Sequence, residues 1–247
     1  CCVIGGCGFI GTHIVDTLLT LDRKITVIDI KPLPSMVLPG EVRYITGDYG
    51  VKDFLVKCLK DVNEVIHLAY STSPKTSFEK PIQDILDNLP ATVGLLEVAS
   101  NLEIEKLVLI SSGGTGYGKV NEVPIKEDHP TNPISPYGIT KLACEKYAYM
   151  FYKLKDLPIV CVRPGNAYGV RQRPFTGQGF IATAIASIMN HEKIVLFGET
   201  GTIRDYIYVT DITNGIIAAL EHGKPGVCYN IGSGGGRSNK DILDEIY

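Results

Sequence analysis

The sequence predicts an α/β protein of the Rossmann type, with a doubly wound parallel sheet and a smaller C-terminal substrate-binding lobe. Three observations predict it: apolar strand-like runs alternate with helical stretches over residues 1–163, a glycine-rich turn joins the first strand to the first helix, and glycines become more frequent after residue 165. Alternation at this spacing is typical of parallel sheets flanked by helices. We therefore expect a Rossmann domain over residues 1–165 and the lobe over residues 166–247.

The expected strands and helices follow one another regularly along the first two thirds of the chain. Strands are predicted where apolar residues run together, and helices where they recur with a period of about 3.6 residues. The strands cover residues 1–4, 24–29, 42–46, 62–67, 106–111 and 158–163, and the helices cover residues 10–21, 52–60, 81–102 and 136–155. The Pro-rich segment 31–40 is expected to form a surface loop.

The turn after the first strand has the spacing of a dinucleotide-binding turn. Residues 1–11 read CCVIGGCGFIG and include Gly5, Gly8 and Gly11. Glycines at these positions allow a tight turn, let the backbone approach a pyrophosphate, and let the helix pack closely on the strand. The N-terminus of the helix would then face the anion. The alternative is a tight strand–helix turn without a ligand.

The strand at residues 24–29 ends in an acidic residue. Asp29 lies 18 residues after Gly11, near the position where a carboxylate meets the ribose hydroxyls of an adenine dinucleotide. Because its charge would repel a 2′-phosphate, the sequence favours NAD over NADP. The alternative is a solvated acidic side chain at a strand end.

Composition argues against several classes of protein. The 247 residues carry a formal net charge of −3 with no run of Lys or Arg, so we expect no nucleic-acid or membrane partner. No apolar stretch has the ~20 residues that span a bilayer. The seven cysteines are scattered and the five histidines lack ligand spacing, so we expect a cytoplasmic protein without a metal site.

Both ends of the sequence look shortened. The first strand begins at residue 1 without an initiator Met, and a helix with Ser238 as its N-cap stops after barely two turns. We expect further residues on both sides, and those beyond Tyr247 are expected to complete the substrate site.

The helix at residues 136–155 carries a tyrosine and a lysine on one face. Ser135 suits the N-cap and Pro136 the first helical position, which places Tyr137 in the first turn. Lys141, four residues on, projects beside Tyr137. Because the helix dipole and the ammonium both favour a phenolate, the pair predicts a general base. The alternative for Tyr137 is an ordinary residue of an amphipathic helix.

A second pair with the same spacing, Tyr149 and Lys153, lies on the same helix. It faces about 120° away around the helix axis and lies well past the first turn. We therefore expect it to pack with its aromatic neighbours, and Tyr137 and Lys141 are the preferred pair.

Small and hydroxyl residues follow the strand at residues 106–111. The run SSGGTGYG at 111–118 stands at the carboxyl end of that strand, where open α/β sheets bind ligands. Ser112 and Thr115 are candidates to hydrogen-bond a substrate hydroxyl or Tyr137. The alternative is a glycine-rich turn whose hydroxyls cap backbone groups.

Together these motifs resemble the extended short-chain dehydrogenases/reductases. The resemblance runs in order from residue 1 to 247 and includes GGCGFIG, HLA at 67–69, SPYGITK at 135–141 and RPGNAYG at 163–169. Within this superfamily the chain is most similar to the NAD-dependent nucleotide-sugar epimerase/dehydratase group. The resemblance implies a Rossmann fold, bound NAD, a nucleotide-sugar substrate and a homodimer.

The resemblance also implies roles for individual residues. The catalytic residues would be Tyr137, Lys141, Ser112 and Thr115. The residues that hold NAD would be Gly5, Gly8, Phe9, Ile10, Gly11, Asp29, Ile30, Asp48, Tyr49, Leu68, Ala69, Tyr70, Asn88, Ser111, Tyr137, Lys141 and Pro164. The substrate would contact Ser112, Thr115, Asn166, Phe197 and Arg204, with Arg204 on the diphosphate. The alternative for Arg204 is a surface ion pair with Asp205 or Asp211.

The chain departs from the family pattern in the loop at 111–118. Gly113 stands where the family usually has Ser or Thr, so the hydroxyl that assists Tyr137 must come from Ser112, Thr115 or water, and Gly116 replaces a residue that is usually apolar. Similar sugar 4,6-dehydratases carry an Asp-Glu pair in this turn. Gly114 and Thr115 stand there instead, and neither can act as an acid or base.

The sequence therefore predicts an NAD-dependent nucleotide-sugar 4-epimerase of the UDP-hexose type, working by transient oxidation at sugar C4. The alternatives are an NAD-dependent nucleotide-sugar oxidoreductase or dehydratase and a non-catalytic binding protein. For the homodimer, apolar residues on the helices at 81–102 and 136–155 are candidates for an interface, or they bury against the sheet. They are Leu95, Val98, Ala148, Tyr149 and Phe151.

Overall fold

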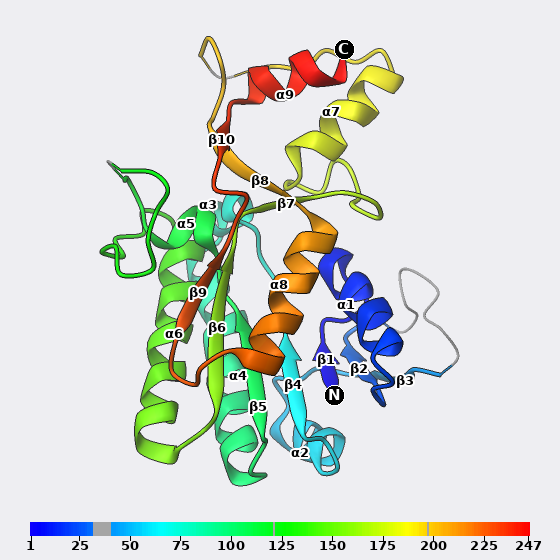
Figure 1. The fold of residues 1–247 in the computed structure, drawn as a ribbon, viewed down its shortest axis with the longest axis vertical. Coiled ribbons are helices and arrows are strands. Elements are labelled where there is room, and N and C mark those ends of the chain that lie inside the picture. Colours follow the sequence, from blue (N-terminus) through cyan, green and yellow to red (C-terminus); the bar gives the residue numbers. More distant parts are fainter. Residues whose placement is uncertain (32–40, 121, 197) are drawn as a thin grey trace.

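A seven-stranded parallel sheet runs through the centre of the molecule, in the order β3-β2-β1-β4-β5-β6-β9 (Figure 1). The computed structural model describes residues 1–31, 41–120, 122–196 and 198–247. The strands of this sheet are β1 Cys2–Ile4, β2 Thr26–Asp29, β3 Arg43–Thr46, β4 Glu64–His67, β5 Lys106–Ile110, β6 Ile159–Pro164 and β9 Cys228–Ile231. The strand order reverses between β1 and β4, and a ligand crevice is expected outside the carboxyl ends of strands at such a point.

Helices cover both faces of this sheet. α2 Lys52–Leu59, α4 Pro81–Asn101 and α6 Pro136–Lys155 lie on one face, and α1 Phe9–Thr20 and α8 Val209–His222 lie on the other (Figure 1). Alternate residues of the strands point to opposite faces. On β5, for example, Leu107 packs toward α4 and α6, whereas Val108 packs toward α1 and α8. The result is a three-layer α/β/α arrangement, which confirms the predicted fold class.

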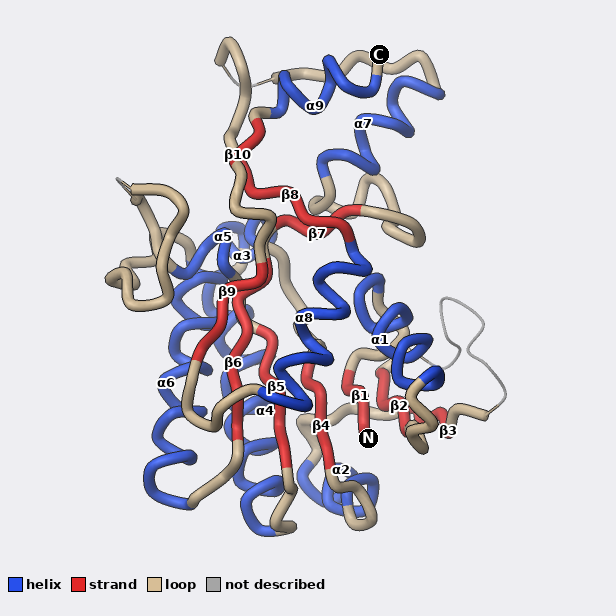
Figure 2. The backbone as a smooth tube through the Cα atoms, viewed as in Figure 1, coloured by secondary structure: helices blue, strands red, loops and turns tan. Residues whose placement is uncertain are grey.

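A second, three-stranded sheet lies above the carboxyl ends of the main strands. It has the order β10-β8-β7, formed by Gly236–Arg237, Arg204–Tyr208 and Asn166–Tyr168 (Figure 2). With α7 Phe180–Met189 and α9 Asn239–Ile246 it makes up the small lobe. Between β8 and β10 the chain returns to the main layers, where α8 packs on α1 and β9 pairs with β6. Residues from the C-terminal third therefore complete the large sheet.

The predicted elements of the first two thirds are all present, with bounds within two residues of those expected. The helix at 136–155 has the predicted bounds because its ends are well marked. The Ser135 hydroxyl accepts a hydrogen bond from the Gly138 N–H at 3.1 Å, and the left-handed Asp156 ends the helix. Ser238 caps α9 in a capping box with Asp241. Apart from Lys31, the expected loop at 31–40 lies outside the described residues.

Most of the apolar helix residues considered for an interface belong to the core. Leu95, Val98, Ala148 and Phe151 are buried against the sheet, and only Tyr149 is exposed. Within the described ranges, no helix is both long and apolar enough to cross a membrane.

Candidate active site

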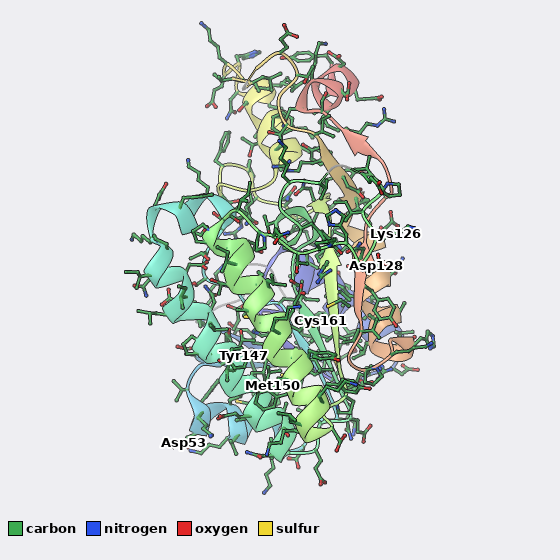
Figure 3. The ribbon with its side chains drawn as sticks, turned by 90° about the vertical axis from the view of Figure 1, so that its left-hand side faces the viewer. Asp53, Lys126, Asp128, Tyr147, Met150 and Cys161 are labelled. Carbon is green, nitrogen blue, oxygen red and sulfur yellow. The ribbon has the colours of Figure 1, made fainter. Side chains whose placement is uncertain are left out.

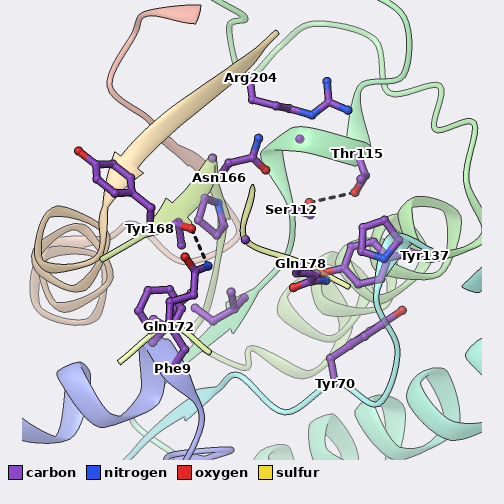
Figure 4. A pocket seen from close by; sticks show the side chains of 18 of the residues that line it. Phe9, Tyr70, Ser112, Thr115, Tyr137, Asn166, Tyr168, Gln172, Gln178 and Arg204 are labelled. Atoms are coloured by element: carbon purple, nitrogen blue, oxygen red, sulfur yellow. Dashed lines mark hydrogen bonds between the residues drawn. The ribbon is translucent and has the colours of Figure 1, made fainter. Parts of the chain in front are cut away.

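A cavity of about 690 Å³ lies between the carboxyl ends of the central strands and the small lobe. This volume is within the usual range for sites that take a cofactor or small molecule. Fifteen of the residues predicted from sequence line it: Gly5, Gly8, Phe9, Ile10, Gly11, Leu68, Tyr70, Ser111, Ser112, Thr115, Tyr137, Lys141, Pro164, Asn166 and Arg204. The cavity thus brings together the glycine turn, the start of α6 and the edge of the small sheet (Figure 4).

The glycine turn leaves no room for side chains. Gly5 has a φ of +84°, and a Cβ there would lie 2.7 Å from the Ala69 nitrogen. A Cβ on Gly11 would lie 2.5 Å from the Gly5 carbonyl oxygen. Gly8 is the N-cap of α1 and supplies no side-chain cap, so the first N–H groups of the helix lack the usual capping acceptor and the N-terminus can receive a phosphate. These features fit the pyrophosphate of a dinucleotide.

Asp29 lies at the end of β2, beside this turn. Its two carboxylate oxygens accept the Cys7 and Lys31 backbone N–H groups, each at 3.3 Å. Asp29 does not line the large cavity; neither do Ile30, Asp48, Tyr49, Ala69 and Asn88. A carboxylate fixed next to the turn nevertheless has the place expected for a ribose-binding acid.

Three of these outlying residues make contacts of their own outside the cavity. Asn88 is buried and holds Ser71 through two hydrogen bonds, at 2.9 Å to its N–H and 3.0 Å to its hydroxyl. The Tyr49 ring packs edge-on against His67 at 4.9 Å. Asp48 is exposed and accepts the Gly50 N–H at 2.8 Å.

Tyr137 and Lys141 both line the cavity from the first turns of α6. The Lys141 ammonium donates to the Ile110 carbonyl oxygen at 2.8 Å. Burial lowers the pKa of Lys141 to about 8, although the nearby Cys144, Asp84 and Glu145 oppose this shift. Lys141 is therefore still largely protonated at neutral pH.

The pKa of Tyr137 differs from the sequence expectation. Burial, and then the charge of Asp84, raise it above the usual value for tyrosine, whereas the helix dipole and Lys141 were expected to lower it. The reason is geometric: the Lys141 ammonium lies 5.8 Å from the centre of the Tyr137 ring and is engaged by Ile110. A phenolate at Tyr137 needs a further positive charge in the cavity.

Asp84, which sequence reasoning missed, is fully buried beneath this pair. It accepts a hydrogen bond from the Thr140 hydroxyl at 2.6 Å and another from Thr72. It thereby joins α4, α6 and the loop after β4. An acidic residue on the inner face of a predicted amphipathic helix was the signal that could have identified it.

The hydroxyl residues of the predicted loop lie near Tyr137 in the cavity (Figure 4). Thr115 donates a hydrogen bond to the Ser112 hydroxyl at 2.9 Å. The short helix α5 Gly113–Gly116 begins between them, and a Cβ at Gly113 would lie 2.9 Å from the Arg163 carbonyl oxygen. With this backbone there is no room for the side chain that the family pattern has at that position.

The small lobe contributes Asn166 from β7 and Arg204 from β8. Asp205 accepts hydrogen bonds from Ser233 and Gly234, and no ion pair of Arg204 with Asp205 or Asp211 occurs among the described residues. The guanidinium is exposed and donates to the Ile203 carbonyl oxygen. Phe197 lies outside the described residues. Sequence reasoning missed several other lining residues of this lobe: Tyr168, Gln172, Gln178, Thr202, Tyr206 and Asn239.

The second Tyr–Lys pair does not line this cavity. The Lys153 ammonium lies over the rings of Tyr152 and Tyr149, at 4.9 and 5.6 Å from their centres. Tyr149 borders a smaller cavity of about 230 Å³ beside β6 and β9. The structure therefore separates the two pairs.

Comparisons with known proteins agree with this geometry. A model of the NAD dependent epimerase/dehydratase family matches residues 1–232. The chain is 34% identical to a putative UDP-glucose 4-epimerase of Methanocaldococcus jannaschii, covering 99% of this chain and 80% of that protein.

Solved structures of epimerases are also similar to this chain. The UDP-glucose 4-epimerase of Thermus thermophilus in complex with NAD superposes with a TM-score of 0.93 at 32% identity, covering 99% of this chain and 81% of that one. The UDP-N-acetylglucosamine 4-epimerase of Methanobrevibacter ruminantium, with bound UDP-N-acetylmuramic acid, gives 0.92 at 32% identity, covering 99% and 80%. This chain belongs to the NAD-dependent epimerase/dehydratase family.

Proposed function

We propose that this chain is an NAD-dependent nucleotide-sugar 4-epimerase of the UDP-hexose type. The observation that carries the proposal is a single cavity that joins a glycine turn suited to a phosphate to a half-buried Tyr137 and a buried Lys141. Relatives named UDP-glucose 4-epimerase, at 34% and 32% identity over 99% of the chain, support the same substrate class.

The chemistry follows from the positions of these residues. Bound NAD supplies a hydride acceptor and a positive charge. Phe9, Ile10 and Gly11, at the N-terminus of α1, would hold its phosphates, and Asp29 its ribose. Tyr137 is the residue placed to take the proton of the sugar 4-hydroxyl, and Lys141 supplies a second positive charge that favours the phenolate.

The hydroxyl pair assists Tyr137 in this proposal. Ser112 and Thr115 already share a hydrogen bond within the cavity, so one hydroxyl orients the other. They take the place of the side chain that Gly113 lacks. Because each hydroxyl both donates and accepts, the pair can bridge the sugar oxygen and the Tyr137 phenol.

The small lobe is proposed to hold the nucleotide and diphosphate. Among the described residues of that lobe, Arg204 is the cation that lines the cavity, and a guanidinium can bind a diphosphate through two parallel hydrogen bonds. Asn166 lies 3.7 Å from a Cβ built on Gly114, so it faces the hydroxyl loop and can contact the sugar phosphate.

The loop chemistry favours epimerisation over dehydration. Elimination of water from the sugar needs an acid and a base near C5 and C6, whereas epimerisation needs one base and reversible hydride transfer. Gly114 and Thr115 offer neither a carboxylic acid nor a carboxylate to the cavity.

The test is product analysis with UDP-glucose and NAD. We expect a 4-epimer without net accumulation of NADH, and a loss of about 10²–10⁴-fold in kcat for Tyr137→Phe, the usual contribution of general-base catalysis. A net oxidoreductase would instead accumulate NADH in proportion to substrate consumed. A non-catalytic binder would behave identically with and without the Tyr137 hydroxyl.

We also propose that the chain forms a homodimer through α4 and α6. These helices pack side by side and expose apolar side chains: Ile82, Ile85 and Leu86 on α4, and Ile139, Tyr147, Met150 and Leu154 on α6. Tyr147 and Met150 lie on the face of α6 that Figure 3 shows. An apolar surface spread over two neighbouring helices is costly in water and suits a helix-on-helix interface. Leu95, Val98, Ala148 and Phe151, the residues considered first, are already buried in the core.

The dimer is tested by light scattering after size-exclusion chromatography. Met150→Glu is expected to yield monomers. Val195→Glu, at an exposed apolar residue of the small lobe, is the matched control and should leave the mass unchanged. A wild-type monomer at micromolar concentration would contradict the proposal.

A cytoplasmic location is proposed from the cysteines. Cys161 and Cys228 are register partners on β6 and β9, and both carry free thiols. Neighbouring cysteines without a disulfide between them suit a reducing compartment. Fractionation of cells that express the tagged full-length protein tests this, and recovery with a membrane or extracellular fraction would contradict it.

A further inference from the structure

Tyr70 lies in the loop after β4 and lines the same cavity as Tyr137 and Lys141; Figure 4 shows it near Tyr137. The Lys141 ammonium is 3.9 Å from the centre of the Tyr70 ring. The Tyr70 and Tyr137 rings pack edge to face, with their centres 4.9 Å apart and their planes at 70°. One aromatic ring thus contacts both members of the pair.

We propose that Tyr70 is a positioning residue whose ring keeps Lys141 charged and in place and holds the ring of Tyr137. The assignment rests on the proposed function of that pair. It differs from the sequence expectation, in which Tyr70 was a contact of the cofactor, because it acts through Lys141.

The ring, and not the hydroxyl, carries this role. The Tyr70 hydroxyl is buried, and in the described part of the chain its contact with the Thr140 side chain does not reach the geometry of a normal hydrogen bond. A buried hydroxyl without a partner disfavours folding, because its hydration is lost without replacement. A phenylalanine would keep the ring contacts with Lys141 and Tyr137 and remove that cost.

Few of the groups around Lys141 are free to interact with its ammonium, so the Tyr70 ring is one of its principal partners. The ionisable groups that face it are Asp84 on α4, His67 on β4, and Tyr137, Cys144 and Glu145 on α6. Two of these are engaged elsewhere: Asp84 accepts from Thr72 and Thr140, and Glu145 pairs with Arg163.

His67 adds no charge to the environment of Lys141. It is fully buried, and burial, then Lys141, lower its pKa to about 3, so it is neutral at physiological pH. Among the described residues the ammonium itself donates a hydrogen bond only to Ile110, a neutral carbonyl. A desolvated ammonium over an aromatic face gains a substantial cation–π interaction. The Tyr70 ring, at 3.9 Å from the ammonium, is placed to supply more of it than the Tyr137 ring at 5.8 Å.

Replacing the Tyr70 ring should change the pKa of Lys141 in a definite direction. Tyr70→Leu removes the stabilisation of the ammonium and leaves the neutral amine unaffected, so the pKa of Lys141 falls. The expected fall is about one pH unit, given the usual strength of a desolvated cation–π contact. Tyr70→Phe keeps the ring, so the pKa of Lys141 should stay within about 0.3 of the wild-type value.

The first experiment measures the pKa of Lys141 directly and does not require that the enzyme be active. Full-length protein with ¹³C-labelled lysine Cε is titrated by NMR, and the Lys141→Met spectrum identifies the signal. Tyr152→Leu is the matched control, because it removes a ring that lies over Lys153 on the same helix. We expect the lower pKa only in Tyr70→Leu. An unchanged Lys141 titration in that variant would overturn the proposal.

The second experiment tests the consequence for catalysis. In Tyr70→Leu the alkaline limb of the kcat/KM profile for UDP-glucose should move about one pH unit lower, and Tyr70→Phe should restore the wild-type limb. If Tyr70→Leu does not fold, Tyr70→Met provides a flexible side chain without a ring. A wild-type protein without epimerase activity would refute the proposed function, while the NMR titration would still decide the role of Tyr70.

Discussion

Removing one partner of the buried ion pair of Arg163 and Glu145, beside the site, is predicted to be strongly destabilising. The two side chains are only 6% and 4% exposed. The guanidinium donates twice to the carboxylate, Nε to Oε1 at 2.9 Å and Nη2 to Oε2 at 2.6 Å, and a third nitrogen donates to the Tyr117 hydroxyl at 2.7 Å. The Tyr117 hydroxyl in turn donates to Asn230, so the network joins α6, β6 and β9.

Glu145→Gln keeps the size of the side chain but leaves Arg163 as an uncompensated buried charge. Removing one partner of a buried pair costs about 3–5 kcal/mol, and because one amide oxygen still accepts a hydrogen bond we expect about 3 kcal/mol. For a chain of 247 residues this corresponds to a decrease in Tm of about 6–12 °C.

The assay is urea unfolding at fixed protein concentration, followed by circular dichroism. The matched control is Glu97→Gln, which removes a partner of Lys52 in a pair whose side chains are 49% and 59% exposed. That variant should lose less than about 0.5 kcal/mol. The double variant Glu145→Met with Arg163→Met should recover most of the stability, because no buried charge remains. A loss below about 1 kcal/mol for Glu145→Gln would refute the reasoning.

Three further predictions concern the site. Gly11→Ala should weaken NAD binding at least ~10-fold in calorimetry, because its Cβ would lie 2.5 Å from the Gly5 carbonyl oxygen and displace the turn; unchanged affinity would contradict the proposed cradle. Arg204→Met should raise KM for UDP-glucose about 10–100-fold with little change in kcat, as expected when a charged hydrogen bond to the diphosphate is lost. Lys141 is protonated below its pKa of about 8 and neutral above it, so kcat/KM should fall above that pH; a rate that stays constant to pH 10 would contradict this.

The fold was largely predictable because local signals agreed along the first 165 residues. The turn with Gly5, Gly8 and Gly11 and the cap at Ser135 each determine a short segment of backbone through their own chemistry. The same residues also line the cavity, which is why much of the site was foreseen.

The C-terminal third was less predictable because its contacts are distant in sequence. β9 joins the large sheet only by pairing with β6, whose residues lie 67 positions earlier, as in Cys161 and Cys228. β9 is too short to show a hydrophobic periodicity that would identify β6 as its partner. The position of α8 likewise becomes evident only from its packing on α1.

The electrostatics of the site also depended on contacts between residues that are far apart in the sequence. The spacing of Tyr137 and Lys141 indicated a lowered tyrosine pKa, but burial and Asp84 raise it. Neither the contact of Tyr70 with Lys141 nor the burial of Asp84 follows from spacing along one helix, because these residues come from different elements.

The most direct test of the central claim uses the full-length protein with UDP-glucose, UDP-N-acetylglucosamine and UDP-glucuronate, with products separated by chromatography. The account predicts the 4-epimer of at least one of these sugars, without accumulated NADH, and its disappearance in Tyr137→Phe. A protein that binds NAD yet converts none of the three, or an active Tyr137→Phe variant, would contradict it.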